Sequence, residues 1–169
     1  MPPPLRSAAR LGVSYRPITP DDLPFLAEVY ASTRAEEVAA SGWPADFQRQ
    51  FLAQQFDAQH RHYQTHYPDA EWLVIVRDGA MVGRLYIEEW PSQFRLIDIA
   101  LLPAARGLGI GSAILDDMFA LAEAAGKAVS IHVEKNNPAM ALYRRLGFET
   151  VEDKGVYDLL EWRHKPPQA

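Results

Sequence analysis

The sequence predicts one α/β domain in which a mixed, mostly antiparallel sheet of about seven strands is flanked by four helices. Three observations support this prediction. The chain has 169 residues, of which 48% are hydrophobic, so it can bury one core. Two β-rich segments meet at Asp78-Gly79, a favoured hairpin turn, which gives an antiparallel pair. Between residues 94 and 134, the order strand, loop, helix, strand gives a parallel pair with a right-handed crossover.

The first part of the chain predicts a strand followed by two helices. Residues 13–18 alternate in the manner of a strand. Thr19 is suited to cap a helix and Pro20 fits its first position, so we expect a helix over residues 20–32. A second helix is expected over residues 45–63, because apolar side chains recur there at helical spacing: Phe47, Phe51, Leu52 and Phe56.

The middle of the chain predicts the centre of the sheet, with strands over residues 71–77, 80–90 and 94–102. The third of these strands ends at Pro103. An amphipathic helix follows over residues 112–125 and is closed by Gly126 in the usual C-terminal position. Residues 128–134 then return as the parallel partner of the third strand.

The last part of the chain predicts a short helix over residues 138–146, stopped by Gly147. A final hairpin follows, with strands over residues 148–152 and 156–162.

The domain organisation follows from the absence of any internal repeat or linker. We expect a single domain over residues 13–163. Three consecutive prolines argue against a helix at the start, so residues 1–12 are expected to be a disordered leader. Residues 164–169 are expected to be a frayed tail.

Composition narrows the function classes. The chain has no cysteine, which excludes disulfides, thiolate metal sites and a cysteine nucleophile. Its net charge is −5 and its lysines and arginines are scattered, so nucleic acid is not an expected partner. No apolar run approaches the roughly 18 residues of a membrane span, so we expect no membrane association and a cytoplasmic protein.

Three histidines close together, His60, His62 and His66, raise the question of a metal site. His60 and His62 are two positions apart and face away from each other on a helix. We therefore expect a polar helix end there, and no metal.

A glycine-rich loop between the strand ending at Leu102 and the following helix is the main functional signal. Gly107, Gly109 and Gly111 let the backbone approach a ligand closely, and the helix start adds unpaired N–H donors for a phosphate. A dinucleotide-binding turn is the main rival, because Glu134 ends the next strand where a ribose-binding acid would lie. Ser112 stands where that fingerprint needs its third glycine, which disfavours this interpretation.

These residues resemble the GNAT superfamily of acetyl-CoA-dependent N-acetyltransferases. The family signature, Q/R-x-x-G-x-G/A, is filled by Arg106, Gly109 and Gly111. A second stretch similar to the family, N-P-A-M-A-L-Y-R-R-L-G-F, covers residues 137–148 at the expected distance. Because the expected order of strands and helices is also similar, the resemblance covers nearly the whole chain.

The resemblance implies that acetyl-CoA is the co-substrate. It implies that the pyrophosphate is held by Arg106, Gly107, Leu108, Gly109, Ile110, Gly111 and Ser112. In the family, the strand before this loop splays from its neighbour and its backbone binds the pantetheine arm, at positions that correspond to Ile99 and Leu101. Asn137 matches a residue that often contacts the cofactor.

The resemblance also implies direct attack of an amine on the thioester. Tyr143 matches the family tyrosine that gives a proton to the departing thiolate, and we favour this role over that of a packed residue at a helix end. The general base is open among Glu88, Glu89, Asp98 and His132. Asp98 is the most unusual of these, because it interrupts an apolar strand where a charge is costly unless it is hydrogen-bonded or functional.

The acceptor is not readable from the sequence. It is expected to be an amine of a small molecule or of a peptide, and a homodimer is left open as the assembly. The main alternative to an enzyme is a domain of the same fold that binds acyl-CoA as a sensor or structural module.

Overall fold

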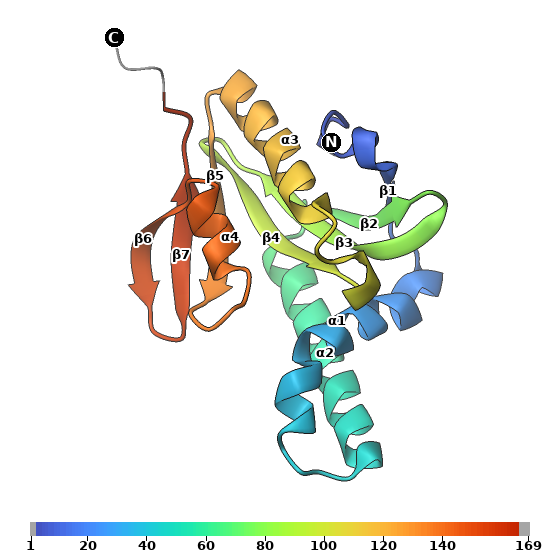
Figure 1. Cartoon of the computed structure of the whole chain (residues 1–169). Coiled ribbons are helices and arrows are strands. Elements are labelled where there is room, and N and C mark those ends of the chain that lie inside the picture. Colours follow the sequence, from blue (N-terminus) through green and yellow to red (C-terminus); the bar gives the residue numbers. More distant parts are fainter. Residues whose placement is uncertain (1–2, 166–169) are drawn as a thin grey trace.

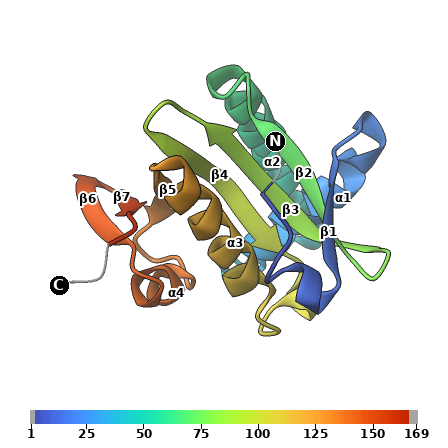
Figure 2. The ribbon, with the colours of Figure 1, turned by 90° about the horizontal axis from the view of Figure 1, so that it is seen from above.

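A computed structural model describes residues 3–165 as one sheet with helices on both faces (Figures 1 and 2). Within this part of the chain the sheet has seven strands in the order β1-β2-β3-β4-β5-β7-β6. The strands are β1 (Val13–Pro17), β2 (Glu71–Arg77), β3 (Ala80–Glu89), β4 (Gln93–Leu101), β5 (Ala128–Glu134), β6 (Glu149–Lys154) and β7 (Tyr157–Trp162). The helices are α1 (Leu23–Ala39), α2 (Ala45–His66), α3 (Ile110–Ala125) and α4 (Met140–Arg145), with 3-10 turns η1 (Ala9–Leu11), η2 (Pro20–Asp22) and η3 (Pro103–Ala105).

This architecture confirms the mixed, mostly antiparallel sheet and the four helices predicted from the sequence. The hairpin between β2 and β3 turns at Asp78 and Gly79, whose φ angles of 51° and 84° are those of the favoured two-residue turn. The first helix differs from expectation. Residues 20–22 form η2, capped by Thr19 and Asp22, and α1 continues to Ala39 because no glycine or proline stops it at Ser32.

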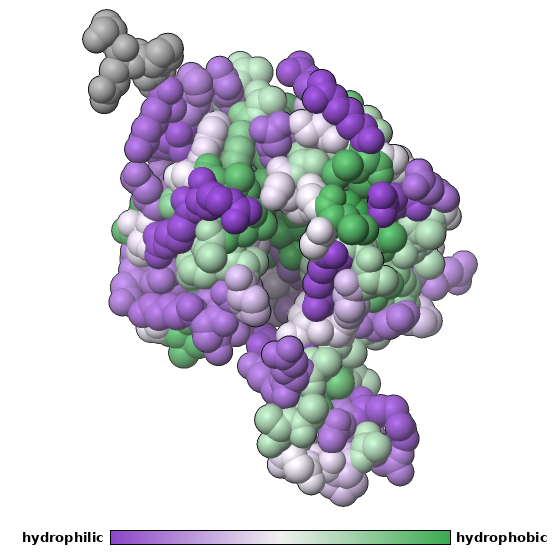
Figure 3. Space-filling model, in the orientation of Figure 1, coloured by the Kyte–Doolittle hydropathy of each residue, from purple (hydrophilic) through white to green (hydrophobic). Residues whose placement is uncertain are grey.

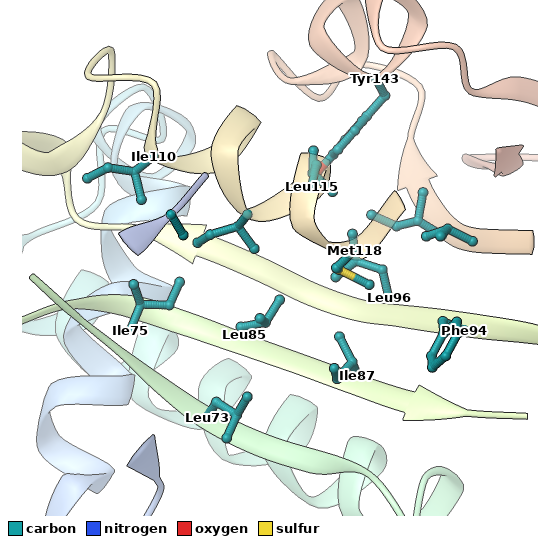
Figure 4. Packing of buried hydrophobic residues seen from close by; sticks show 14 of the residues in the cluster. Leu73, Ile75, Leu85, Ile87, Phe94, Leu96, Ile110, Leu115, Met118 and Tyr143 are labelled. Carbon is teal, nitrogen blue, oxygen red and sulfur yellow. The ribbon is translucent and has the colours of Figure 1, made fainter. Parts of the chain in front are cut away.

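Two hydrophobic layers hold the sheet between its helices. On one face, α3 packs through Leu115 on the inward side chains of the central strands, among them Leu85 and Leu96 (Figure 4). On the other face, α1 and α2 pack through a smaller cluster that includes Leu26, Phe56 and Val74. The helical hairpin of α1 and α2 extends away from the sheet (Figure 1). Both faces of the central strands are therefore covered.

The parallel pair at the centre of the sheet is short, as the predicted splay requires. β4 pairs with β5 only from Gln93 to Leu96, and the last pair joins Leu96 to Ile131. Beyond this point the two strands separate. On its other side, β4 carries a bulge, because Ile87 pairs with Leu96 and Tyr86 pairs with Asp98, which leaves Ile97 as the extra residue. The separation opens the sheet at its middle.

The N-terminal segment differs from the disordered leader expected for residues 1–12. The carboxylate of Asp117 on α3 accepts backbone N–H bonds from Arg6, Ser7 and Ala8, at 3.2, 2.8 and 3.0 Å. Asp117 is buried and so needs these donors, and Ala8 is buried in turn. The segment is held by a residue more than a hundred positions away.

Residues 1–2 of the expected leader and 166–169 of the expected tail lie outside the described residues. Within residues 3–165, no helix is long and apolar enough to cross a membrane.

Candidate active site

A cavity of about 980 Å³ lies where β4 and β5 separate. It is enclosed by the splayed strands, the start of α3, the segment leading into α4, and side chains of α1 and α2. The surface is hollowed at this place (Figure 3). Segments from both ends of the chain therefore meet around one space.

The glycine loop forms one end of this cavity. Gly107 and Gly109 have φ angles of 74° and 83°, which glycine adopts without strain. α3 begins directly after Gly109, and no side chain caps it, so its first N–H groups are available for an anion. Of the residues expected to bind the cofactor, six of this loop line the cavity: Arg106, Gly107, Gly109, Ile110, Gly111 and Ser112. Leu108 does not line it, and its side chain is exposed.

Arg106 ties the loop to its surroundings. Its Nε donates to the carbonyl of Leu101 at 2.9 Å, and its Nη2 donates to Ser32 Oγ on α1 at 3.1 Å. These bonds place a permanent positive charge beside the helix start.

The strand next to the loop has backbone groups on its cavity side that no other strand of the described chain pairs with, although the Leu101 carbonyl accepts the bond from Arg106. Ile99 and Leu101 pair with β3 on one side, while on the other side β5 has already turned away. Both residues line the cavity. Asn137 lines it from the opposite wall, and its Oδ1 accepts the backbone N–H of Ala139 at 2.8 Å. The Asn137 side-chain amide nitrogen is thereby left for other partners.

Tyr143 of α4 and Asp98 of β4 both line the cavity. Tyr143 is 4% exposed, and its side chain reaches from α4 toward Leu115 of α3 (Figure 4). Burial, and then the negative charge of Asp98, raise the pKa of Tyr143 well above its ordinary value. The phenol is thus fully protonated at neutral pH, as a donor to a thiolate must be, while the raised pKa also makes it a weaker acid than free tyrosine.

Asp98 is held by a buried cation that the sequence did not indicate. Its carboxylate forms an ion pair with Arg84 of β3, whose side chain is 3% exposed, while that of Asp98 is 19% exposed. Arg84 Nη2 also donates to Gln59 Oε1 of α2 at 3.0 Å. Tyr63 of α2 is also close enough to feel the charge of Asp98. Burial, and then this charge, raise the pKa of the Tyr63 phenol. No local pattern predicts this group, since its members come from three distant segments.

The other carboxylates considered as bases lie elsewhere. Glu88 does not line the cavity, and in the sheet it faces Arg95 of β4. One oxygen of Glu88 is buried and has no hydrogen-bond partner within residues 3–165. Glu89 is paired with Lys127 at 2.6 Å. The structure therefore brings Asp98, but neither glutamate, to Tyr143.

His132 is the fourth residue considered, and it does line the cavity from β5. Its Nδ1 lies 3.0 Å from Nη1 of Arg95. Partial burial, and then the charge of Arg95, lower the pKa of His132 below its ordinary value, although the residue as a whole is exposed. The imidazole is therefore neutral at neutral pH.

Glu134, which suggested a ribose-binding acid, is engaged within the protein. Arg34 of α1 donates to both of its oxygens, at 2.9 and 3.3 Å, and the Tyr157 hydroxyl donates at 3.3 Å. The bond from Arg34 holds the pKa of Glu134 below its usual range. This contact joins α1 to β5 across the cavity. In the described part of the chain, no group of three side chains is arranged to hold a metal ion.

Comparisons with known proteins agree with this geometry. A family model described as the acetyltransferase (GNAT) family matches residues 33–148. A curated relative, the ribosomal protein bS18 alanine N-acetyltransferase of Haemophilus influenzae, is 27% identical over 86 residues. That match covers 50% of this chain and 59% of the relative, so the chain spans less than two thirds of the length of that protein.

Solved structures show the same fold. The PaiA N-acetyltransferase of Thermoplasma acidophilum, solved with coenzyme A, has a TM-score of 0.65 at 16% identity, over 90% of this chain and 99% of that one. An acetyltransferase of Thermus thermophilus also has a TM-score of 0.65, at 19% identity, over 91% and 98%. A GNAT family acetyltransferase of Elizabethkingia anophelis, solved with acetyl-CoA, has a TM-score of 0.58 at 14% identity, over 90% and 99%.

Proposed function

The chain belongs to the acetyltransferase (GNAT) family, and from this premise we propose that it is an enzyme that transfers the acetyl group of acetyl-CoA to an amine. The observation that carries the proposal is the shared cavity. Its lining includes an uncapped helix start behind a glycine loop, and also the protonated phenol of Tyr143 and the carboxylate of Asp98, whose charge acts on that phenol. The helix start suits the anionic pyrophosphate of acetyl-CoA, and the phenol suits the thiolate that departs.

The cofactor residues proposed are those that line the cavity. Gly107, Gly109 and the first N–H groups of α3 bind the pyrophosphate, with Arg106 supplying charge. The backbone of Ile99 and Leu101 takes the pantetheine arm in place of the missing strand. The side-chain amide of Asn137 is a further donor to it. The arm then runs from the glycine loop toward the closed end of the splay.

The proposed step is a direct displacement. The neutral amine attacks the thioester carbonyl carbon, a C–N bond forms, and the C–S bond breaks as the tetrahedral intermediate collapses. The thiolate takes the proton of the Tyr143 phenol, and the carboxylate of Asp98 takes the proton that the amine loses, directly or through water. Arg84 holds Asp98 in place through their ion pair. Glu88 takes no part in this step, because it lies outside the cavity lining.

We place the catalytic unit within residues 13–163 and the acceptor on the side of the cavity that α1 and α2 cover. The acceptor is an amine of a small molecule, a lysine or a protein N-terminus. Alanine N-acetylation of a ribosomal protein, named for the Haemophilus influenzae relative, is one member of this class.

The experiment is a thiol-release assay with acetyl-CoA over polyamines, aminoglycosides, amino acids and peptide N-termini, with the product identified by mass. We expect acceptor-dependent release of free coenzyme A and one added acetyl group. Leu108→Ala is the matched control for loop variants, because its side chain is exposed and does not line the cavity. Saturable acetyl-CoA binding without release on any amine would instead support a sensor or structural module.

A further inference from the structure

Arg95 is a buried cation with no carboxylate partner in the described part of the chain. The residue is 6% exposed on β4. Its Nε donates to Ser130 Oγ at 3.0 Å, its guanidinium lies 4.6 Å from the centre of the Trp90 ring, and its Nη1 reaches His132 Nδ1 at 3.0 Å. Glu88 faces it across the strands but forms no ion pair with it. The groups that contact this guanidinium, a hydroxyl, an indole ring and an imidazole, are therefore not carboxylates.

The contact with Arg95 fixes the hydrogen position on His132. A guanidinium is always protonated and can only donate, so Nδ1 of His132 must be the acceptor. The neutral ring then carries its hydrogen on Nε2. The other charged groups that act on His132 come from β6, where Lys154 reinforces the effect of Arg95 and Glu152 opposes it. Because the lone pair of Nδ1 is occupied and Nε2 is protonated, His132 is configured as a donor and not as a base.

The position of His132 gives this donor a target. The last pair of the parallel strands joins Leu96 and Ile131, so His132 is the first residue of β5 beyond the pairing. It lines the same cavity as Asp98 and Tyr143. Its Nε2 has no hydrogen-bond partner within residues 3–165. The pantetheine arm proposed above runs along β4 toward this closed end, which places the thioester beside His132.

We propose that His132 donates its Nε2–H to the thioester carbonyl oxygen and stabilises the oxyanion that forms when the amine attacks. The C=O electron pair moves to this oxygen as the C–N bond forms and returns when the C–S bond breaks. His132 keeps its proton throughout. Arg95 is a positioning residue, because it selects the tautomer that can donate. The inference rests on the proposed acetyl transfer.

Three substitutions at one position separate a donor from a base. His132→Gln keeps an N–H donor, His132→Glu offers only an acceptor, and His132→Ala removes both. Loss of one oxyanion donor lowers kcat by about 10²-fold or more, so we expect that loss for Ala and Glu, with the KM for acetyl-CoA changed by less than about threefold. Gln should exceed both by at least about tenfold in kcat. Any other order overturns the proposal, including equal activity of all variants.

A measurement without turnover tests the tautomer itself. Nitrogen NMR of the histidine rings, with His132 assigned by its absence from the His132→Gln spectrum, should show hydrogen on Nε2 and a pKa below the ordinary value of about 6.5. Arg95→Met should release the tautomer and raise the pKa, while Arg49→Met, at an exposed arginine of α2, should change neither. Hydrogen on Nδ1, or ordinary titration, would overturn the proposal. If no amine is acetylated, the proposed function fails while this spectrum still decides the tautomer.

Discussion

Removal of Asp98 should destabilise the fold far more than removal of its partner. Asp98→Ala leaves the guanidinium of Arg84 without its carboxylate, and that side chain is 3% exposed and cannot lose its proton. Stranding a buried charge costs about 3–5 kcal/mol. We expect about 3 kcal/mol, the low end, because the cavity beside Asp98 lets water reach the site. This corresponds to roughly a hundredfold in the folding equilibrium.

Removal of Arg84 should destabilise the fold less than removal of Asp98. Arg84→Met strands Asp98, whose side chain is 19% exposed toward the cavity, where it can be hydrated or protonated. The double variant should be more stable than Asp98→Ala alone, since it leaves no unpaired charge. Urea unfolding followed by tryptophan fluorescence measures all three. Asp46→Ala is the matched control, because its pair with Arg49 is largely exposed and should contribute little.

The result that would refute this reasoning is specific. If Asp98→Ala costs less than about 1 kcal/mol, Arg84 is not dependent on its partner. If the double variant is no more stable than Asp98→Ala, the loss comes from packing and not from a stranded charge.

Three further predictions concern the cofactor loop, the phenol and a buried carboxylate. Tyr143→Phe should lower kcat and leave acetyl-CoA binding unchanged by calorimetry; unchanged turnover would remove the phenol from the step. Gly109→Ala should weaken acetyl-CoA binding and cost about 1 kcal/mol of stability, because φ is 83° there; Leu108→Ala, tested alongside, should do neither. The pKa of Asp22 is held well below its usual range by Arg16 and then by the Thr19 N–H, so its stabilisation is full above about pH 4 and lost as pH falls further. Asp22→Asn should therefore lower the urea midpoint at pH 7 but change it less at pH 3, and an equal change at both would contradict this.

The features predicted correctly from the sequence are those fixed by local physics. Asp78-Gly79 specifies a turn whose two positive φ angles few other pairs tolerate. Gly109 is likewise required where α3 begins, so the loop could be located before any contact was known. The order of strands and helices follows from the spacing of the hydrophobic residues and from the turns and glycines that separate the elements.

The features that the sequence did not predict depend on contacts between distant segments. The N-terminal segment is ordered by Asp117, whose burial on α3 is not visible in residues 1–12. Arg34 and Glu134 are a hundred positions apart, and nothing in either local pattern indicates their pairing. Arg84 resembles an ordinary strand arginine until the bulge of β4 brings Asp98 against it. Such pairs are properties of the tertiary fold.

The choice of base shows why a residue type alone does not define a role. Histidine is the usual residue for proton transfer near neutral pH, and His132 of β5 lines the cavity. Its neighbour Arg95 occupies the lone pair that a base would need, and this contact crosses from β4 to β5. Glu88 shares a strand face with Arg84, yet lies outside the cavity lining. The charge of Asp98 is costly to place in an apolar strand. The ion pair with Arg84 offsets this desolvation cost but does not remove it. The chemistry at each position is therefore set by its partner, which the fold supplies.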